Sequence, residues 1–153
     1  MSPISIMQVE WLILSDAAQV VGQKLYLLGG GWNIFVVNTG FPLKKNLAVS
    51  VGVLVPWNDT NRKHRLHLEV TDDEGKGTLA SLDGEFEVGR PPGIPAGMEQ
   101  RIQVAANLPI ELVGPGGYAV VARLDNGEER RTSFHALAGP ALAARRSPQQ
   151  GAA

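Results

Sequence analysis

The sequence predicts an all-β protein, an immunoglobulin-like antiparallel β-sandwich of about eight strands. Apolar residues recur with a period of two in segment after segment, which is typical of strands with one buried face. Gly, Pro, Asn and Asp interrupt these segments at intervals of about ten residues, as the turns of a sandwich do. The run Pro115-Gly116-Gly117-Tyr118 favours the immunoglobulin-like class, because a tyrosine hydroxyl anchors a comparable corner in those domains.

Two strands are expected in the first part of the chain. Four residues of the first strand lie two apart and are predicted to face the core: Met7, Val9, Trp11 and Ile13. Residues 24–37 are predicted to form the second strand, interrupted by Gly29-Gly30-Gly31. No Gly-Lys-Ser/Thr follows these glycines and no GxGxxG pattern is met, so they predict a bulge or sharp bend and not a phosphate-binding loop.

The remaining strands are predicted from rows of inward-facing residues two apart. These rows are Leu47, Val49, Val51, Val53 and Val55; Leu66, Leu68 and Val70; Phe86 and Val88; Ile102, Val104, Ala106, Leu108 and Ile110; Tyr118, Val120, Ala122 and Leu124; and Thr132, Phe134 and Ala136.

The last two strands allow a test of register, because directly opposed residues of a hairpin point to the same face. A two-residue loop at Asn126-Gly127 would turn Phe134 to the wrong face. A three-residue loop, Asp125-Asn126-Gly127, places Tyr118 opposite Phe134 and suits a type I turn closed by Gly127 in a left-handed bulge. The sequence therefore predicts the three-residue loop.

One β-sandwich domain is expected over residues 1–138. The run at residues 90–97, Arg-Pro-Pro-Gly-Ile-Pro-Ala-Gly, cannot donate a regular ladder of hydrogen bonds and is predicted to be a loop between strands. Residues 139–153 are rich in Ala, Gly, Gln and Arg, so a disordered C-terminal tail is predicted. Residues 4–14 lack a basic leader, and no apolar run reaches the roughly 18 residues of a membrane span. A cytoplasmic location is therefore expected.

Composition argues against several classes of function. The 153 residues carry 14 Lys and Arg against 15 Asp and Glu, and the resulting net charge of -1 does not gather nucleic acid or an anionic membrane. The absence of Cys excludes a disulfide frame, a thiolate zinc site, an iron–sulfur cluster and a cysteine nucleophile. We therefore expect no nucleic-acid partner, no membrane partner and no cofactor.

The candidate catalytic and metal-binding residues do not form a recognisable pattern. His64 and His67 are three apart, which places them on opposite faces of a strand and prevents them from binding one metal ion together. Asp72-Asp73-Glu74-Gly75 fits no calcium-loop spacing and predicts a polar turn with its glycine at positive φ. His135 follows Ser133 by two residues, but the predicted register turns both toward water, and no Gly-x-Ser-x-Gly is present. We expect no catalytic residue and no metal site.

Three segments carry apolar residues on both faces. The residues out of phase with the predicted inward rows are Leu12, Leu14, Tyr26, Leu28, Phe35 and Val37. Two explanations stay open: either other parts of the chain cover these strands, or the six residues form an interface with a partner protein or a second copy of the chain. Burial within the chain is the favoured interpretation.

Two stretches resemble the opening of a family of small uncharacterised bacterial β-sandwich proteins, a domain of unknown function. They are residues 9–18 (VEWLILSDAA) and residues 22–32 (GQKLYLLGGGW). Residues 115–118 (PGGY) and 124–128 (LDNGE) are similar to the later part of the same family. The resemblance spans most of residues 7–136 and implies a stand-alone β-sandwich, but it implies no catalytic residue.

Three functions remain open. The leading hypothesis is a non-enzymatic module that binds a protein or self-associates, because the chain consists of strands and turns without a catalytic constellation. The second is a small-ligand or carbohydrate-binding sandwich that uses Trp32, Trp57 and the loop at residues 91–97. The third is an enzyme of unrecognised type, which would require a pocket that contains Asp16, His64 or His135.

Overall fold

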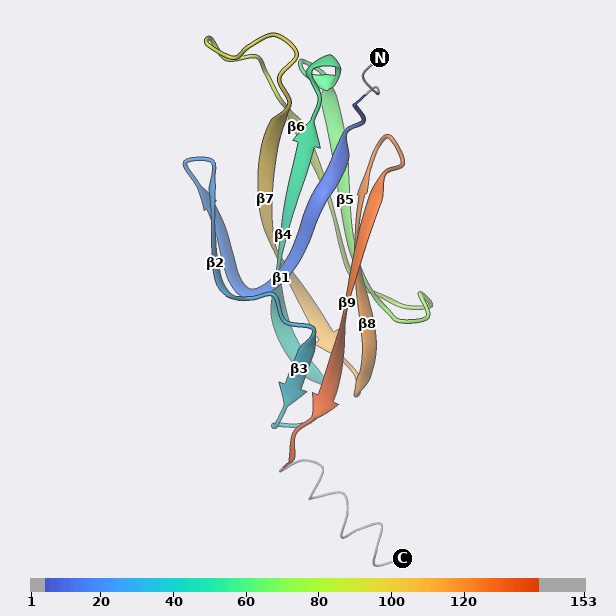
Figure 1. Ribbon diagram of the computed structural model, residues 1–153. Coiled ribbons are helices and arrows are strands. Elements are labelled where there is room, and N and C mark those ends of the chain that lie inside the picture. Colours follow the sequence, from blue (N-terminus) through green and yellow to red (C-terminus); the bar gives the residue numbers. More distant parts are fainter. Residues whose placement is uncertain (1–4, 141–153) are drawn as a thin grey trace, which may run out of the picture.

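The computed structural model describes residues 5–140, which form two β-sheets around one core (Figure 1). The expected C-terminal tail lies outside the described residues from position 141 onward. In chain order the elements are β1 (Gln8–Val21), β2 (Lys24–Gly30), β3 (Ile34–Val37), β4 (Leu43–Val55), the 3-10 helix η1 (Trp57–Asp59), β5 (Lys63–Asp72), β6 (Thr78–Glu87), β7 (Gln100–Leu112), β8 (Gly116–Leu124) and β9 (Glu129–Ala138). Within residues 5–140 no helix has the length and apolar character needed to cross a membrane.

The strands are divided between a four-stranded sheet, β2-β1-β4-β7, and a five-stranded sheet, β3-β9-β8-β5-β6. Adjacent strands are antiparallel except for β3 and β9, which are parallel. The all-β prediction is confirmed. The expected count of eight is corrected to nine for the described residues, because residues 24–37 form two strands in different sheets. Gly29 and Gly31 have φ of 63° and 85°, so the predicted bend at the glycines is the point where the chain changes sheet.

The core contains the inward rows that alternation predicts. On β4 the five residues Leu47, Val49, Val51, Val53 and Val55 are all 0% exposed. They pack in one cluster with residues of β5, β7 and β8, which come from both sheets. Burial of each such aliphatic side chain contributes roughly 1.5–3 kcal/mol to folding. The two sheets are therefore held face to face mainly by apolar contacts.

Trp11 and Ile13 do not face the core, contrary to the prediction, because β1 contains a β-bulge. Val9 lies opposite Val53, whereas the next pair along the same ladder joins Trp11 to Gly52. This shift leaves one extra residue in β1, and an extra residue reverses the alternation of all side chains that follow it.

After the bulge, Leu12 and Leu14 turn inward and pack in the core, where Leu14 is only 2% exposed. Trp11 lies on the outer face of the sheet over Gly52, and a Cβ at residue 52 would overlap its indole ring. The glycine thus makes room for a large aromatic side chain on the neighbouring strand.

The β8–β9 hairpin has the predicted register, with Tyr118 opposite Phe134. The amide of Leu124 donates to the carbonyl of Glu128 over 2.8 Å, which closes a loop of three residues. Gly127 has a φ of 90°, so it takes the left-handed conformation expected at the end of that loop. The prediction of a three-residue loop is confirmed.

The corner before β8 is anchored as predicted. The Tyr118 hydroxyl donates to the carbonyl of Gly114 over 2.7 Å. The Tyr118 ring also stacks on Phe134, with ring centroids 5.3 Å apart. One side chain therefore fixes the turn into β8 and contributes to the core beneath it.

Two polar segments also agree with the prediction. Gly75 has a φ of 70°, and its amide donates to the carbonyl of Asp72 over 3.0 Å, which confirms the polar turn. Residues 90–97 form a loop between β6 and β7.

Candidate functional site

A two-residue turn builds the β1–β2 hairpin, which Figure 1 shows at one side of the molecule. Gly22 and Gln23 have φ of 57° and 65°, and Val21 lies opposite Lys24. Two consecutive residues with positive φ in a two-residue loop define a type I′ turn, which matches the natural twist of antiparallel strands. The geometry fixes which side chains share each face of the hairpin.

The hairpin lies over the outer face of its own sheet. The side-chain amide of Gln103, which points outward from β7, donates to the carbonyl of Gln23 over 2.9 Å. Ala48 and Ser50 also point outward from β4, yet both are 0% exposed. Figure 1 shows β1 bending at mid-length and returning as part of the hairpin. We infer that the bent hairpin covers β4, where small residues leave room for it.

The two faces of the hairpin differ in exposure. The inner face carries half-buried apolar side chains, namely Ala18, Val20, Leu25 and Leu27. The outer face carries Val21, Tyr26 and Leu28, which are 51%, 56% and 73% exposed. We call these three residues the hairpin patch. Its residues come from both strands, because Tyr26 lies opposite Gln19 and Leu28 lies opposite Ala17.

The structure separates the six residues of the candidate interface. Leu14 and Val37 are buried, each 2% exposed. Leu12 and Phe35 are partly buried and pack against the core. Tyr26 and Leu28 are the two that lie together at the surface.

Val21 joins Tyr26 and Leu28 in the patch, although alternation alone did not identify it. The sequence signal that locates it is the Gly22-Gln23 turn, because a two-residue loop places Val21 directly opposite Lys24. Lys24, Tyr26 and Leu28 alternate along β2, so Val21 shares their face.

A second group of exposed apolar residues lies on the parallel pair β3–β9. Ile34, Val36 and Leu137 are 54%, 47% and 40% exposed, and Val36 lies opposite Leu137. The strand β3 has only four residues. This group therefore lies on a shorter strand than the hairpin patch, because β2 has seven residues.

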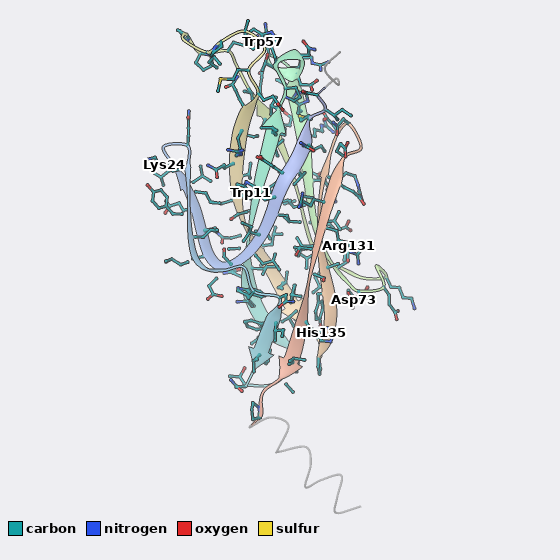
Figure 2. All side chains as sticks on the ribbon, in the orientation of Figure 1. Trp11, Lys24, Trp57, Asp73, Arg131 and His135 are labelled. Atoms are coloured by element: carbon teal, nitrogen blue, oxygen red, sulfur yellow. The ribbon has the colours of Figure 1, made fainter. Side chains whose placement is uncertain are left out.

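The two tryptophans of the carbohydrate hypothesis do not form one site. Trp32 packs with Phe35 and Phe134, and the centroid of each phenylalanine ring lies 5.7 Å from the centroid of the Trp32 ring. Trp57 stacks against the guanidinium carbon of Arg90 at 3.9 Å. Figure 2 shows Trp57 at one end of the molecule and His135, the chain neighbour of Phe134, toward the other. Each indole already has an intramolecular partner.

The polar residues of the enzyme hypothesis also lie apart. His64 is 6% exposed, and its Nε2 donates to the carbonyl of Asp59 over 2.7 Å. Its Nδ1 lies 3.6 Å from a carboxylate oxygen of Asp125. The hollow beside His64 has a volume of about 260 Å³, and neither Asp16 nor His135 lines it.

The expected separation of the histidines is confirmed. His64 is buried next to the ring of Phe86, whereas His67 faces outward and contacts the carboxylate of Asp83 at 2.8 Å. At the predicted polar turn, the Asp72 carboxylate accepts a hydrogen bond from the amide of Lys76 over 2.8 Å. Among residues 5–140, no three His, Cys, Asp or Glu side chains gather in a way that would hold a metal ion.

An ion pair spans the sheet at the bulge. The Arg101 guanidinium on β7 donates to a carboxylate oxygen of Glu10 on β1 over 2.8 Å. This hydrogen bond, with the positive charge of Arg101, lowers the pKa of Glu10 below its ordinary value. The pair is exposed and joins β1 to β7 across the intervening strand β4, and such surface ion pairs contribute little to stability.

Comparison with known proteins gives a family but no function. Residues 10–137 match the model of a family of unknown function, DUF6941, which confirms the expected membership in such a family. Among solved structures, "X-ray structure of Northeast Structural Genomics Consortium target SoR45" is similar with 17% sequence identity, 89% of each chain covered and a TM-score of 0.31. A search of curated proteins finds no match.

Proposed function

We propose that this chain, which belongs to the DUF6941 family of unknown function, is a non-enzymatic protein-binding module whose contact surface is the hairpin patch. The observation that carries the proposal is the exposure of Val21, Tyr26 and Leu28 on one face of one hairpin. Burial of apolar surface contributes about 25 cal/mol of favourable free energy per Å², which these exposed side chains do not gain in the single chain. A cluster of large apolar side chains at the surface is typical of a site that a partner covers.

The chemistry of the hairpin patch favours a protein partner over a sugar. Two of its three side chains are aliphatic, and aliphatic groups offer no ring face on which a sugar could stack. The indoles that would serve a sugar are already packed, Trp32 on Phe134 and Trp57 on Arg90. A non-catalytic role is supported by the separation of Asp16 and His135 from the hollow beside His64.

A photo-crosslinking experiment tests this function. A photoreactive phenylalanine analogue replaces Leu28 in one variant and Leu82, an exposed apolar residue of β6, in the control. We expect irradiation in cells to join the Leu28 variant to one defined protein, identified by mass spectrometry, and Tyr26→Glu to abolish the adduct. Equal adducts at Leu28 and Leu82, or none at Leu28, would contradict the proposed surface.

We further propose that the two sheets form an immunoglobulin-like sandwich. In such domains strands A, B and E are neighbours in one sheet, and C, F and G are neighbours in the other. The orders β1-β4-β7 and β5-β8-β9 correspond to these sets in the same chain order. Tyr118 near the start of β8 supports the assignment, because its hydroxyl bonds back to Gly114 as the corner tyrosine of strand F does. The end of β1 beyond its pairing with β4, together with β2, is then an insertion between strands A and B.

Engineered disulfides test the immunoglobulin-like assignment. In antibody domains a cysteine two residues after the corner tyrosine pairs with a cysteine of strand B. The corresponding position here is Val120, and the candidate partners on β4 are Leu47, Val49 and Val51, all 0% exposed like Val120. We expect Val120→Cys to form a disulfide with a cysteine at one of the three positions. Failure of all three pairs in folded protein would contradict the assignment.

A further inference from the structure

We propose that the partner of the hairpin patch is a second copy of this chain, joined to the first by antiparallel pairing of their β2 strands. This inference rests on the proposed function and names its partner. Three features carry it: an open strand edge, a self-complementary register and the absence of opposed like charges.

The outer edge of β2 is open. Among residues 5–140, β2 is the terminal strand of the four-stranded sheet, and β1 is its single neighbour there. In a two-residue type I′ hairpin the pair next to the turn, Val21 and Lys24, exchanges both hydrogen bonds. The backbone groups of Leu25 and Leu27 then point away from β1. An edge of this kind pairs readily with another strand, and β2 contains neither proline nor more than one charged residue to prevent it.

One register satisfies the free backbone groups. Antiparallel pairing centred on Tyr26 places Leu25 of one copy opposite Leu27 of the other, and their outward N–H and C=O groups exchange hydrogen bonds. A centre at Leu27 would bring Gly29 into the ladder, but Gly29 has a φ of 63° and is not extended. A centre at Leu25 would bring in Gln23, which has a φ of 65°. The extended segment is therefore symmetric about Tyr26.

The side chains are compatible with this two-fold register. The two Tyr26 rings lie opposite each other as a non-hydrogen-bonded pair, the closer of the two kinds of antiparallel pair. Lys24, the one charged residue of β2, lies opposite Leu28 of the other copy, where its aliphatic stem can cover the leucine. The two lysines stand at opposite ends of the pairing, so no like charges meet. The same patch on both copies then forms an isologous interface, which is the kind found in two-fold symmetric dimers, the commonest soluble oligomers.

Single-cysteine variants test the register directly, because the natural chain contains no cysteine. Tyr26→Cys places the two sulfurs across a non-hydrogen-bonded pair, where a disulfide can form. We expect mild oxidation to convert most of this variant to a covalent dimer. Leu28→Cys, which faces Lys24, and Leu82→Cys on the edge strand β6 are expected to form little intermolecular disulfide under the same oxidation.

Analytical ultracentrifugation tests the pairing without an introduced cysteine, because the cysteine substitution could itself weaken the dimer. We expect the natural chain to sediment at twice its mass of 16.3 kDa. Tyr26→Glu, which opposes two carboxylates, is expected to sediment as a folded monomer with an unchanged circular dichroism spectrum. The control Leu82→Glu is expected to remain dimeric.

Two results would overturn self-pairing: a natural chain that sediments at 16.3 kDa at all concentrations, or equal oxidation of the Tyr26, Leu28 and Leu82 cysteine variants. If the Leu28 photo-crosslink then joins a different protein, self-pairing fails while the proposed function stands. If that crosslink is also absent, both proposals fail.

Discussion

Gly127 illustrates how a single backbone angle constrains a residue. Its φ is 90°, and a β-branched side chain is strongly disfavoured at positive φ. We expect Gly127→Val to lower the free energy of unfolding by about 1 kcal/mol or more. Thermal unfolding is the measurement. The control Gly84→Val is expected to be neutral, because Gly84 lies on β6 with ordinary φ and open space where a Cβ would stand. Equal stability of the two variants would contradict the turn geometry.

Two buried serines, one on β1 and one on β4, differ in their hydrogen bonds. Ser15 and Ser50 are both 0% exposed, and the Ser15 hydroxyl donates to the carbonyl of Ala17 over 3.1 Å. The Ser50 hydroxyl has no hydrogen-bond partner among the described residues.

We expect Ser15→Ala to lower the free energy of unfolding by about 1 kcal/mol and Ser50→Ala to leave it unchanged or raise it. Chemical denaturation of both variants measures the difference. A comparable loss in both would mean that the Ser50 hydroxyl is bonded in solution and that this account of the covered face is wrong.

At the residue scale, local chemistry made some roles predictable. The loop glycine and the corner tyrosine were identified because a turn type or a corner motif specifies their backbone neighbours. Trp11 was not, because its environment depends on Gly52 of another strand. Its outward position follows from the pairing of β1 with β4, which the neighbouring residues in the sequence do not indicate.

At the scale of elements, the β1 bulge decides which residues reach the core. Apolar residues occupy consecutive positions from Trp11 to Leu14, so either alternation agrees with a strand that has one buried face. The sequence therefore predicted the strand but not its phase. The pairing of β1 with β4 selects Leu12 and Leu14 as the inward residues.

The contact between Trp11 and Gly52 tests this pairing. We expect Gly52→Val to lower the free energy of unfolding by about 1–3 kcal/mol, because the new side chain overlaps the indole. In a Trp11→Ala background the same substitution is expected to cost much less. A double-mutant cycle by chemical denaturation measures the coupling. Additive effects of the two substitutions would contradict the contact.

At the scale of the whole molecule, the sequence predicted an all-β core but not the division of strands between sheets. Residues 24–37 read as one strand, and the three glycines gave only a local bend. The transfer of β3 to the other sheet, parallel to β9, depends on contacts between residues about a hundred positions apart, as between Ile34 and His135. The candidate interface was predicted only in part for the same reason, since tertiary packing buries Leu14 and Val37 and leaves the hairpin patch exposed.

The most direct test of the hairpin as a contact surface follows the backbone amides of β2. In the single chain the N–H groups of Leu25 and Leu27 face the open edge, whereas that of Tyr26 faces β1 and serves as the internal reference. NMR-detected hydrogen exchange is measured at low and high protein concentration. We predict that the exchange of Leu25 and Leu27 slows markedly at high concentration while Tyr26 stays protected throughout. Rapid exchange of Leu25 and Leu27 at every concentration would contradict pairing through this edge.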